Sequence, residues 1–279
     1  MRTISFLPKQ SQETEKLPMV SDSVILRIEE HIGYVVLNRP ESGNIVNQEM
    51  AYMFKDVCAK INQNAEIYVV VVTGVGETFC DGSELEKLLI NGSMDADYAK
   101  TLIDDFSIAT SVSSIDKPVI VAINGNAMGQ GLELALACDI RYASAGSHFG
   151  LLQVSQGLIP MNGGTQRLPR LVGKGQALEL ILTARIIDTR EALRIGLINK
   201  RVTKEMLNSE VEAVVKLIAT KGPVALKLAK EAISRGLESS LEEGLGLEID
   251  LYSLLQTTDD RREGIQAFLE KRQPKFKGQ

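Results

Sequence analysis

The stretch Ala127–Asp139, AMGQGLELALACD, places a glycine turn and a carboxylate at the start of a predicted helix. The turn is Gly129-Gln130-Gly131, and Glu133 follows it inside an otherwise apolar run. Glycine lets the backbone approach a ligand closely and adopt a positive φ. The first amides of a helix are unpaired and carry partial positive charge, and a glutamate can act as a general base. The pattern predicts a site that stabilises a negative oxygen and moves a proton.

A second glycine loop, FCDGSEL, contains Gly82 and Ser83. It follows the apolar run 67–73 (IYVVVVT), as the first turn follows the run 117–124 (KPVIVAIN). Both runs are typical of strands buried on both faces, and ligands bind at the carboxyl ends of such parallel strands. We therefore expect one amide from each loop to bind a single oxyanion. The alternative is that each loop is an ordinary strand-to-helix turn.

These two loops require an α/β scaffold. Residues 23–38 are expected to form a β-hairpin, 47–62 a helix capped by its asparagine, and 129–138 a helix followed by the strand DIRYAS. Buried strands that alternate with helices indicate largely parallel pairing. After residue 204 four helical segments follow, so 22–204 is predicted as the α/β core and 205–279 as a helical oligomerisation region. Residues 1–21 are predicted as a flexible lead-in.

Composition excludes several classes of protein. The net charge of −5 argues against a broad nucleic-acid surface. The three cysteines fit no zinc or redox spacing and favour a reducing compartment, so we expect a cytoplasmic location. No apolar run is long enough to span a membrane, and neither a dinucleotide motif, a P-loop nor a metal motif such as HExxH is present.

Several segments together resemble the crotonase (enoyl-CoA hydratase/isomerase) superfamily, and the resemblance covers roughly residues 22–279. The segments that carry it are RPESGNIVNQEM, VVVVTGVGETFCDGSEL, KPVIVAINGNAMGQGLELALACDIRYAS, FGLLQVSQGLIPMNGGTQRLPRLVG and ARIIDTREALRIGLINKRV. The resemblance implies a spiral of ββα units with a C-terminal helical trimerisation region. It also implies an acyl-CoA thioester as substrate, no metal or redox cofactor, and a homotrimer or dimer of trimers.

By the same resemblance, the oxyanion amides belong to Ser83 and Gln130, and one of the two usual catalytic glutamates is Glu133. Most members have glycine in place of Gln130. Its backbone amide survives the change, although we expect its side chain to alter one wall of the cleft. The second glutamate is replaced by Gln153, in the segment 149–153. This is the largest departure from the family pattern.

A glutamine can hold a water but has no titratable proton at neutral pH. The first prediction is therefore an acyl-CoA lyase or hydratase that acts through an enolate, in which Glu133 moves the proton and Gln153 orients water or substrate. The enzymatic alternatives are an acyl-CoA decarboxylase and an enoyl-CoA isomerase. An alternative from another class is a catalytically weak acyl-CoA-binding protein.

The resemblance also assigns residues to substrate binding. Those expected to hold coenzyme A, or to lie beside the first oxyanion loop, are Asn44, Asp81, Ser83, Glu84 and Leu85. Those expected to shape the acyl pocket are Met128, Met161 and Asn162. Phe268 and Lys271 are expected at a nucleotide pocket, often across a subunit boundary.

Overall fold

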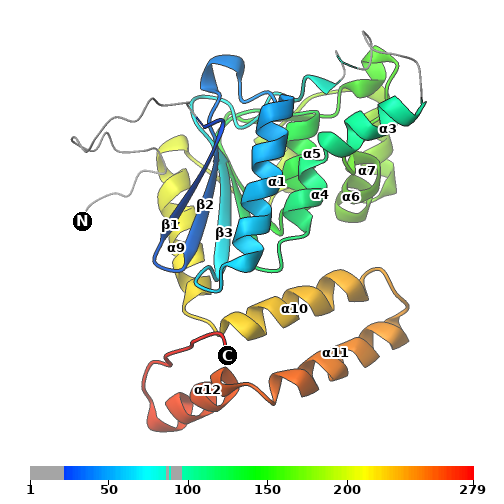
Figure 1. Cartoon of the computed structure of the whole chain (residues 1–279). Helices are drawn as coiled ribbons and strands as arrows, with labels where there is room; N and C mark the ends of the chain where they lie inside the picture. Colours follow the sequence, from blue (N-terminus) through cyan, green and yellow to red (C-terminus); the bar gives the residue numbers. More distant parts are fainter. Residues whose placement is uncertain (1–21, 86–87, 89–95) are drawn as a thin grey trace, which may run out of the picture.

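The computed structural model describes residues 22–85, 88 and 96–279, so the predicted lead-in 1–21 lies outside the described residues. Within these ranges the chain forms a sheet of six strands and a second, smaller sheet of three. Helices cover both faces of the larger sheet, and three C-terminal helices extend beyond it (Figure 1).

The larger sheet has the strand order β1-β2-β3-β4-β6-β9. Its strands are β1 (Val24–Glu29), β2 (Ile32–Leu37), β3 (Val69–Gly74), β4 (Val119–Ile123), β6 (Ile140–Ser144) and β9 (Lys200–Val202). β1 and β2 form the predicted antiparallel hairpin, and every later neighbour in this sheet is parallel. The smaller sheet contains β5 (Ala127–Met128), β7 (His148–Gly150) and β8 (Ile187–Asp188).

Successive valines of β3 pack into different cores. Val70 and Val72 face the core formed with the first group of helices, whereas Val69 and Val71 face α9. Strand side chains alternate between faces, so a strand that is buried on both faces is apolar at every position. This explains the continuous run IYVVVVT and confirms the expectation of a buried parallel strand.

The helices of the first group are α1 (Gln48–Gln63), α3 (Ala96–Asp105), α4 (Ile108–Ser113) and α5 (Gln130–Ala137). Asn47 caps α1 by accepting a hydrogen bond from the Met50 amide at 2.8 Å, as predicted. The helices that follow are α6 (Gly164–Val172), α7 (Lys174–Thr183) and α8 (Thr189–Arg194). Short 3-10 turns lie at η1 (Pro40–Ser42), η2 (Gln153–Gln156) and η3 (Lys204–Met206).

The four predicted C-terminal helices are present as α9 (Leu207–Ala219), α10 (Pro223–Gly236), α11 (Leu241–Leu255) and α12 (Asp259–Glu270). α9 packs against the sheet through Leu207, Val211 and Val215. α10, α11 and α12 lie beyond the sheet (Figure 1), and Lys230 anchors α10 by an ion pair with Asp139 at 2.7 Å. The division of the chain at residue 204 stays a prediction.

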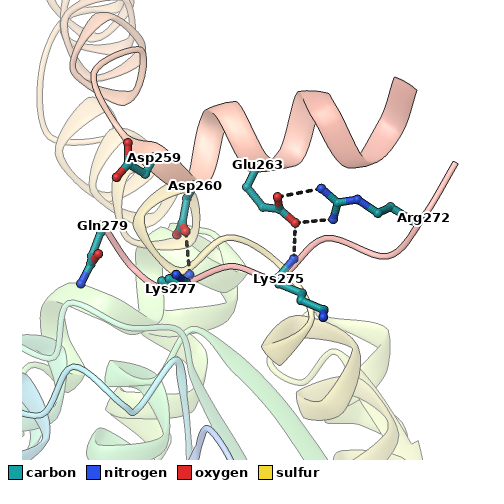
Figure 2. A pocket seen from close by; sticks show the side chains of 7 residues that line it. All are labelled: Asp259, Asp260, Glu263, Arg272, Lys275, Lys277 and Gln279. Atoms are coloured by element: carbon teal, nitrogen blue, oxygen red, sulfur yellow. Dashed lines mark hydrogen bonds and ion pairs between the residues drawn. The ribbon is translucent and has the colours of Figure 1, made fainter. Parts of the chain in front are cut away.

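The C-terminal tail folds back on α12 through two carboxylates (Figure 2). Asp260, which is 5% exposed, accepts hydrogen bonds from the amides of Lys277 at 2.7 Å and Gly278 at 2.9 Å. Glu263 pairs with the Arg272 guanidinium and accepts the Lys275 amide, and these contacts lower the pKa of Glu263 to about 2. The tail is therefore held by specific polar contacts.

An Asp260→Ala variant is expected to release this tail, because the amides of Lys277 and Gly278 lose their charged acceptor. A hydrogen bond to a charged acceptor contributes about 1.5–3 kcal/mol. Limited trypsin digestion should then cleave after Lys275 and Lys277 faster than in the parent protein. The control is Asp259→Ala, whose side chain is 72% exposed and pairs with Arg262 on the same helix. Equal cleavage rates in the two variants would contradict the account.

Candidate active site

The two glycine loops meet in the structure. Gly82 has φ +122° and Gly129 has φ +50°, both in the region that favours glycine. A Cβ placed on Gly129 would lie 3.8 Å from the Gly82 Cα atom, and one on Gly82 would lie 3.8 Å from the Met128 carbonyl oxygen. A bridge between Cys80 and Ala127, with the Met128 amide donating to the Cys80 carbonyl at 2.9 Å, holds the loops together. The two loops therefore lie side by side, which a shared oxyanion site would require.

The amides predicted for the oxyanion site follow these two glycines. The Gly82 carbonyl accepts the Val46 amide at 3.0 Å and the Glu84 amide donates to the Val46 carbonyl at 2.8 Å. This pattern turns the Ser83 amide to the side opposite Val46. Gln130 is the first residue of α5, and helix geometry supplies no internal partner for an amide at that position.

Gln130 keeps an ordinary backbone conformation. Among the described residues, positive φ outside glycine occurs at Glu30, Asn44, Ala184 and Lys271, so the unusual torsion of this turn falls on Gly129. The Gln130 side chain is 2% exposed, and its Nε2 atom donates to the Phe106 carbonyl, between α3 and α4. Its Oε1 atom has no hydrogen-bond partner. The glutamine thus ties the turn to the α3–α4 junction.

Glu133 is 2% exposed and lies in the first turn of α5. Its Oε1 atom accepts hydrogen bonds from the Asn162 amide at 2.7 Å and the Gly164 amide at 2.9 Å. Amide donors of this kind offset the cost of burying a carboxylate. They come from a distant segment of the chain, so Glu133 does more than cap its own helix.

Gln153 begins the η2 turn and is 4% exposed. Its Nε2 atom lies 3.5 Å from the position that a Cβ on Gly129 would take, and its Oε1 atom has no hydrogen-bond partner. The Glu133 amide in turn donates to the Gly129 carbonyl at 3.1 Å. The structure therefore brings Gln153, Gly129 and the start of α5 into one cluster.

The predicted acyl-pocket residues lie around this cluster. Asn162 is 4% exposed, supplies one of the two amides to Glu133, and has an unpartnered Oδ1 atom. The Met128 sulfur lies 3.4 Å from the position of a Cβ on Gly150. Met161 is partly buried against the main core.

The residues predicted for coenzyme A near the first loop have different surroundings. The Asn44 side chain is buried and joins two loop segments: it accepts the Arg39 amide and donates to the carbonyls of Val75 and Thr78, each at 2.9 Å. Leu85 is 1% exposed and belongs to the core.

Two acids, Asp81 and Glu84, lie beside the first loop. The Asp81 carboxylate lies over Gly43, where a Cβ would come within 2.7 Å of Oδ2. Partial burial raises the pKa of Asp81, against the lowering effect of its hydrogen bond to Thr78. Glu84 pairs with Arg39 at 3.7 Å and keeps 41% of its side chain exposed.

Phe268 and Lys271 do not meet the cluster within one chain. They lie on or just after α12, which is below the core in Figure 1, whereas α5 lies within the core. Phe268 is 83% exposed, and Lys271 ends the helix with φ +55°.

Three groups at the site were not anticipated from the sequence. They are the Gly164 amide, the Phe106 carbonyl and the guanidinium of Arg167, which donates to the Asn162 carbonyl at 2.9 Å. The pair Gly163-Gly164 before a helix was the available signal for the first of these. Nothing in the local sequence points to Phe106.

Comparison with known proteins agrees with this architecture. Residues 27–279 match the family model for enoyl-CoA hydratase/isomerase. The crotonyl-CoA hydratase of Syntrophomonas wolfei is 37% identical over 92% of this chain and 99% of its own length. The short-chain-enoyl-CoA hydratase of Clostridium acetobutylicum is 37% identical over 91% of this chain and 97% of its own.

The crystal structure of an enoyl-CoA hydratase from Bacillus anthracis superposes with a TM-score of 0.87 at 38% identity, covering 92% of this chain and all of the other. The expected crotonase fold, an α/β core with a C-terminal helical region, is therefore confirmed. The match spans both the core and the C-terminal helices. The chain belongs to the enoyl-CoA hydratase/isomerase family, the crotonase superfamily.

Proposed function

We propose that the protein adds water across the double bond of an α,β-unsaturated acyl-CoA thioester, with Glu133 as its one catalytic carboxylate. The observation that carries the proposal is the placement of Glu133, buried beside the Gly129 turn with one oxygen held by two amides. We assign proton transfer to this carboxylate. The names of the relatives, crotonyl-CoA hydratase and short-chain-enoyl-CoA hydratase, support the same reaction class.

In the proposed reaction the thioester carbonyl accepts hydrogen bonds from the Ser83 and Gln130 amides. Water attacks Cβ while Glu133 takes one of its protons, and the π electrons move to the thioester oxygen as an enolate. The enolate then collapses, Cα takes the proton from Glu133, and the 3-hydroxyacyl thioester is complete. The reaction balances in atoms and charge, and it uses Glu133 as its single titratable group.

We assign to Gln153 the role of orienting the attacking water. Its unpartnered Oε1 atom accepts the proton of the water that is not transferred, and this fixes the orientation of the attacking oxygen. The role is positional, because an amide gives up no proton at neutral pH. The negative charge that develops on the thioester oxygen is stabilised by amides, and the proton is carried by a carboxylate. The proposal therefore requires neither a metal nor a redox cofactor, and activity should survive EDTA.

One observation also favours isomerisation. The position usually taken by a second carboxylate carries an amide, and one carboxylate is enough to move a proton between two carbons of an enolate. Decarboxylation through the same enolate is the other enzymatic alternative. These reactions differ in product mass: hydration adds one water, isomerisation leaves the mass unchanged, and decarboxylation removes carbon dioxide.

The deciding experiment incubates the protein with crotonyl-CoA and follows the loss of the conjugated-thioester absorbance, with mass spectrometry of the product. A product heavier by one water supports hydration. Substrate binding without turnover, on crotonyl-CoA and on longer, branched and malonyl-type thioesters, would overturn the enzymatic proposal in favour of an acyl-CoA-binding protein.

We further propose a homotrimer, or a dimer of trimers, working in the cytoplasm. Large apolar side chains on the C-terminal helices are exposed in the single chain, including Leu237 at 82% and Leu241 at 79%. In such an assembly Phe268 and Lys271 would reach the coenzyme A of a neighbouring subunit. The residues Asn44, Asp81, Glu84 and Leu85 would bind the coenzyme A of their own subunit.

All three cysteines are free and buried, which fits a reducing compartment. Within the described ranges, no helix has the length and apolar character needed to cross a membrane.

A further inference from the structure

Arg167 on α6 contacts the turn that holds the catalytic carboxylate. Its Nη1 atom donates to the Asn162 carbonyl at 2.9 Å, and its Nη2 atom donates to the Ser113 hydroxyl of α4 at 3.2 Å. Its own amide donates to the Gly163 carbonyl at 2.7 Å. The arginine is half-buried. It therefore joins α6, the 162–164 turn and α4.

The Arg167 guanidinium packs directly against the 162–164 turn. Gly163 has φ +102°, and a Cβ there would lie 2.0 Å from Arg167 Nη1, so the guanidinium fills the space that a side chain would need. The amides on either side of Gly163, from Asn162 and Gly164, both donate to Glu133 Oε1. The Asn162 amide thus donates a hydrogen bond to the Glu133 carboxylate, and the Asn162 carbonyl accepts one from Arg167.

The charge of Arg167 also acts on Glu133. Burial lowers the pKa of Arg167, and the negative charge of Glu133 opposes that effect. Cys138, the C-cap residue of α5, and Glu238, after α10, act on the arginine in the same direction as Glu133. The attraction is mutual, so the cation favours the ionised form of Glu133, the form that accepts a proton from water.

We propose that Arg167 is a positioning residue for Glu133: it holds the 162–164 turn so that two amides converge on Oε1, and its positive charge stabilises the negative charge of the carboxylate. The kinetic part of this inference rests on the proposed function. The contact with Ser113 links the same turn to α4, which packs beside α5 in the core.

The test compares Arg167→Met with Arg167→Lys in the full-length protein. Arg167→Met should lower kcat for enoyl-CoA turnover by about 10- to 100-fold, the range expected when a reacting group is misplaced by about an ångström, with little change in KM. The acidic limb of the kcat/KM profile should move to higher pH, because an unsupported carboxylate takes up its proton more readily. Arg167→Lys keeps the charge, so its acidic limb should stay near the parent position.

The matched control is Arg170→Met, one turn away on α6, where the exposed guanidinium bonds to Gln166 of its own helix. It should leave kcat and the pH profile unchanged. An unchanged kcat in Arg167→Met would overturn the proposal. A loss of activity with the parent pH profile, equal in the Met and Lys variants, would also overturn it, because that result marks a purely structural role.

A second measurement is independent of turnover. Amide hydrogen exchange at Asn162 and Gly164 should accelerate in Arg167→Met and stay slow in Arg170→Met. If the parent protein turns over no thioester while this exchange difference is seen, the proposed function fails and the positioning of the turn stands. Unchanged exchange in Arg167→Met would refute the positioning itself.

Discussion

A Glu133→Gln variant is expected to lose enoyl-CoA hydration almost completely, with a fall in kcat of about 10²- to 10⁴-fold. The amide keeps an oxygen that can accept the Asn162 and Gly164 amides, so the local hydrogen bonds survive the change. It loses the capacity to accept a proton from water. Stopped-flow measurement of conjugated-thioester absorbance, at saturating substrate, gives kcat directly.

The matched control is Glu66→Gln, at an exposed turn that precedes β3 and so lies at the end of the strand opposite the glycine loops. It makes the same chemical change away from the cluster and should keep full activity. Binding of a saturated acyl-CoA should be similar in both variants, because the oxyanion amides are untouched. A Glu133→Gln protein that retained half of the parent kcat would remove Glu133 from the mechanism.

The sequence predicted the parts of the site that local patterns control. Glycines with positive φ after buried strands marked both loops, and Glu133 in an apolar helix marked a buried acid. Strand β3, fully apolar from Val69 to Val72, was predictable for the same reason: its composition reports burial on both faces. The cap at Asn47 follows from side-chain chemistry within one helical turn.

Contacts between distant segments were not predictable in this way. The Gln130 side chain was expected to alter a wall of the cleft, but it bonds to Phe106, and only tertiary packing places that carbonyl within reach. The amides that hold Glu133 come from residues 29 and 31 positions later in the chain. The contact between Arg167 and the 162–164 turn exists only in the folded chain, so the sequence around either of them does not predict it.

In the proposed mechanism Gln153 stands where the family resemblance places a second carboxylate, and this sets the expectation for Gln153→Glu. Restoring an acid at this 4%-exposed position should raise kcat for crotonyl-CoA by about 10- to 100-fold, since water activation and Cα protonation are then shared between two groups. Two neighbouring buried carboxylates repel each other, so one keeps its proton at neutral pH, as an acid for Cα requires. The gain in kcat should therefore appear at neutral pH and decline at alkaline pH. The pH profile of the variant should then have a basic limb that the parent profile lacks.

Gln156→Glu, at an exposed position of the same η2 turn, is the control for added charge and should change neither kcat nor the profile. Thermal unfolding of the two variants measures the effect of the new carboxylate on stability separately from its effect on kcat. Gln153→Glu alone should lower the free energy of unfolding, because it buries a carboxylate. An unchanged kcat in a folded Gln153→Glu protein would mean that the shape of the pocket, and not the missing acid, limits hydration. The amide at residue 153 would then be a specificity element, selected for the substrate that it orients.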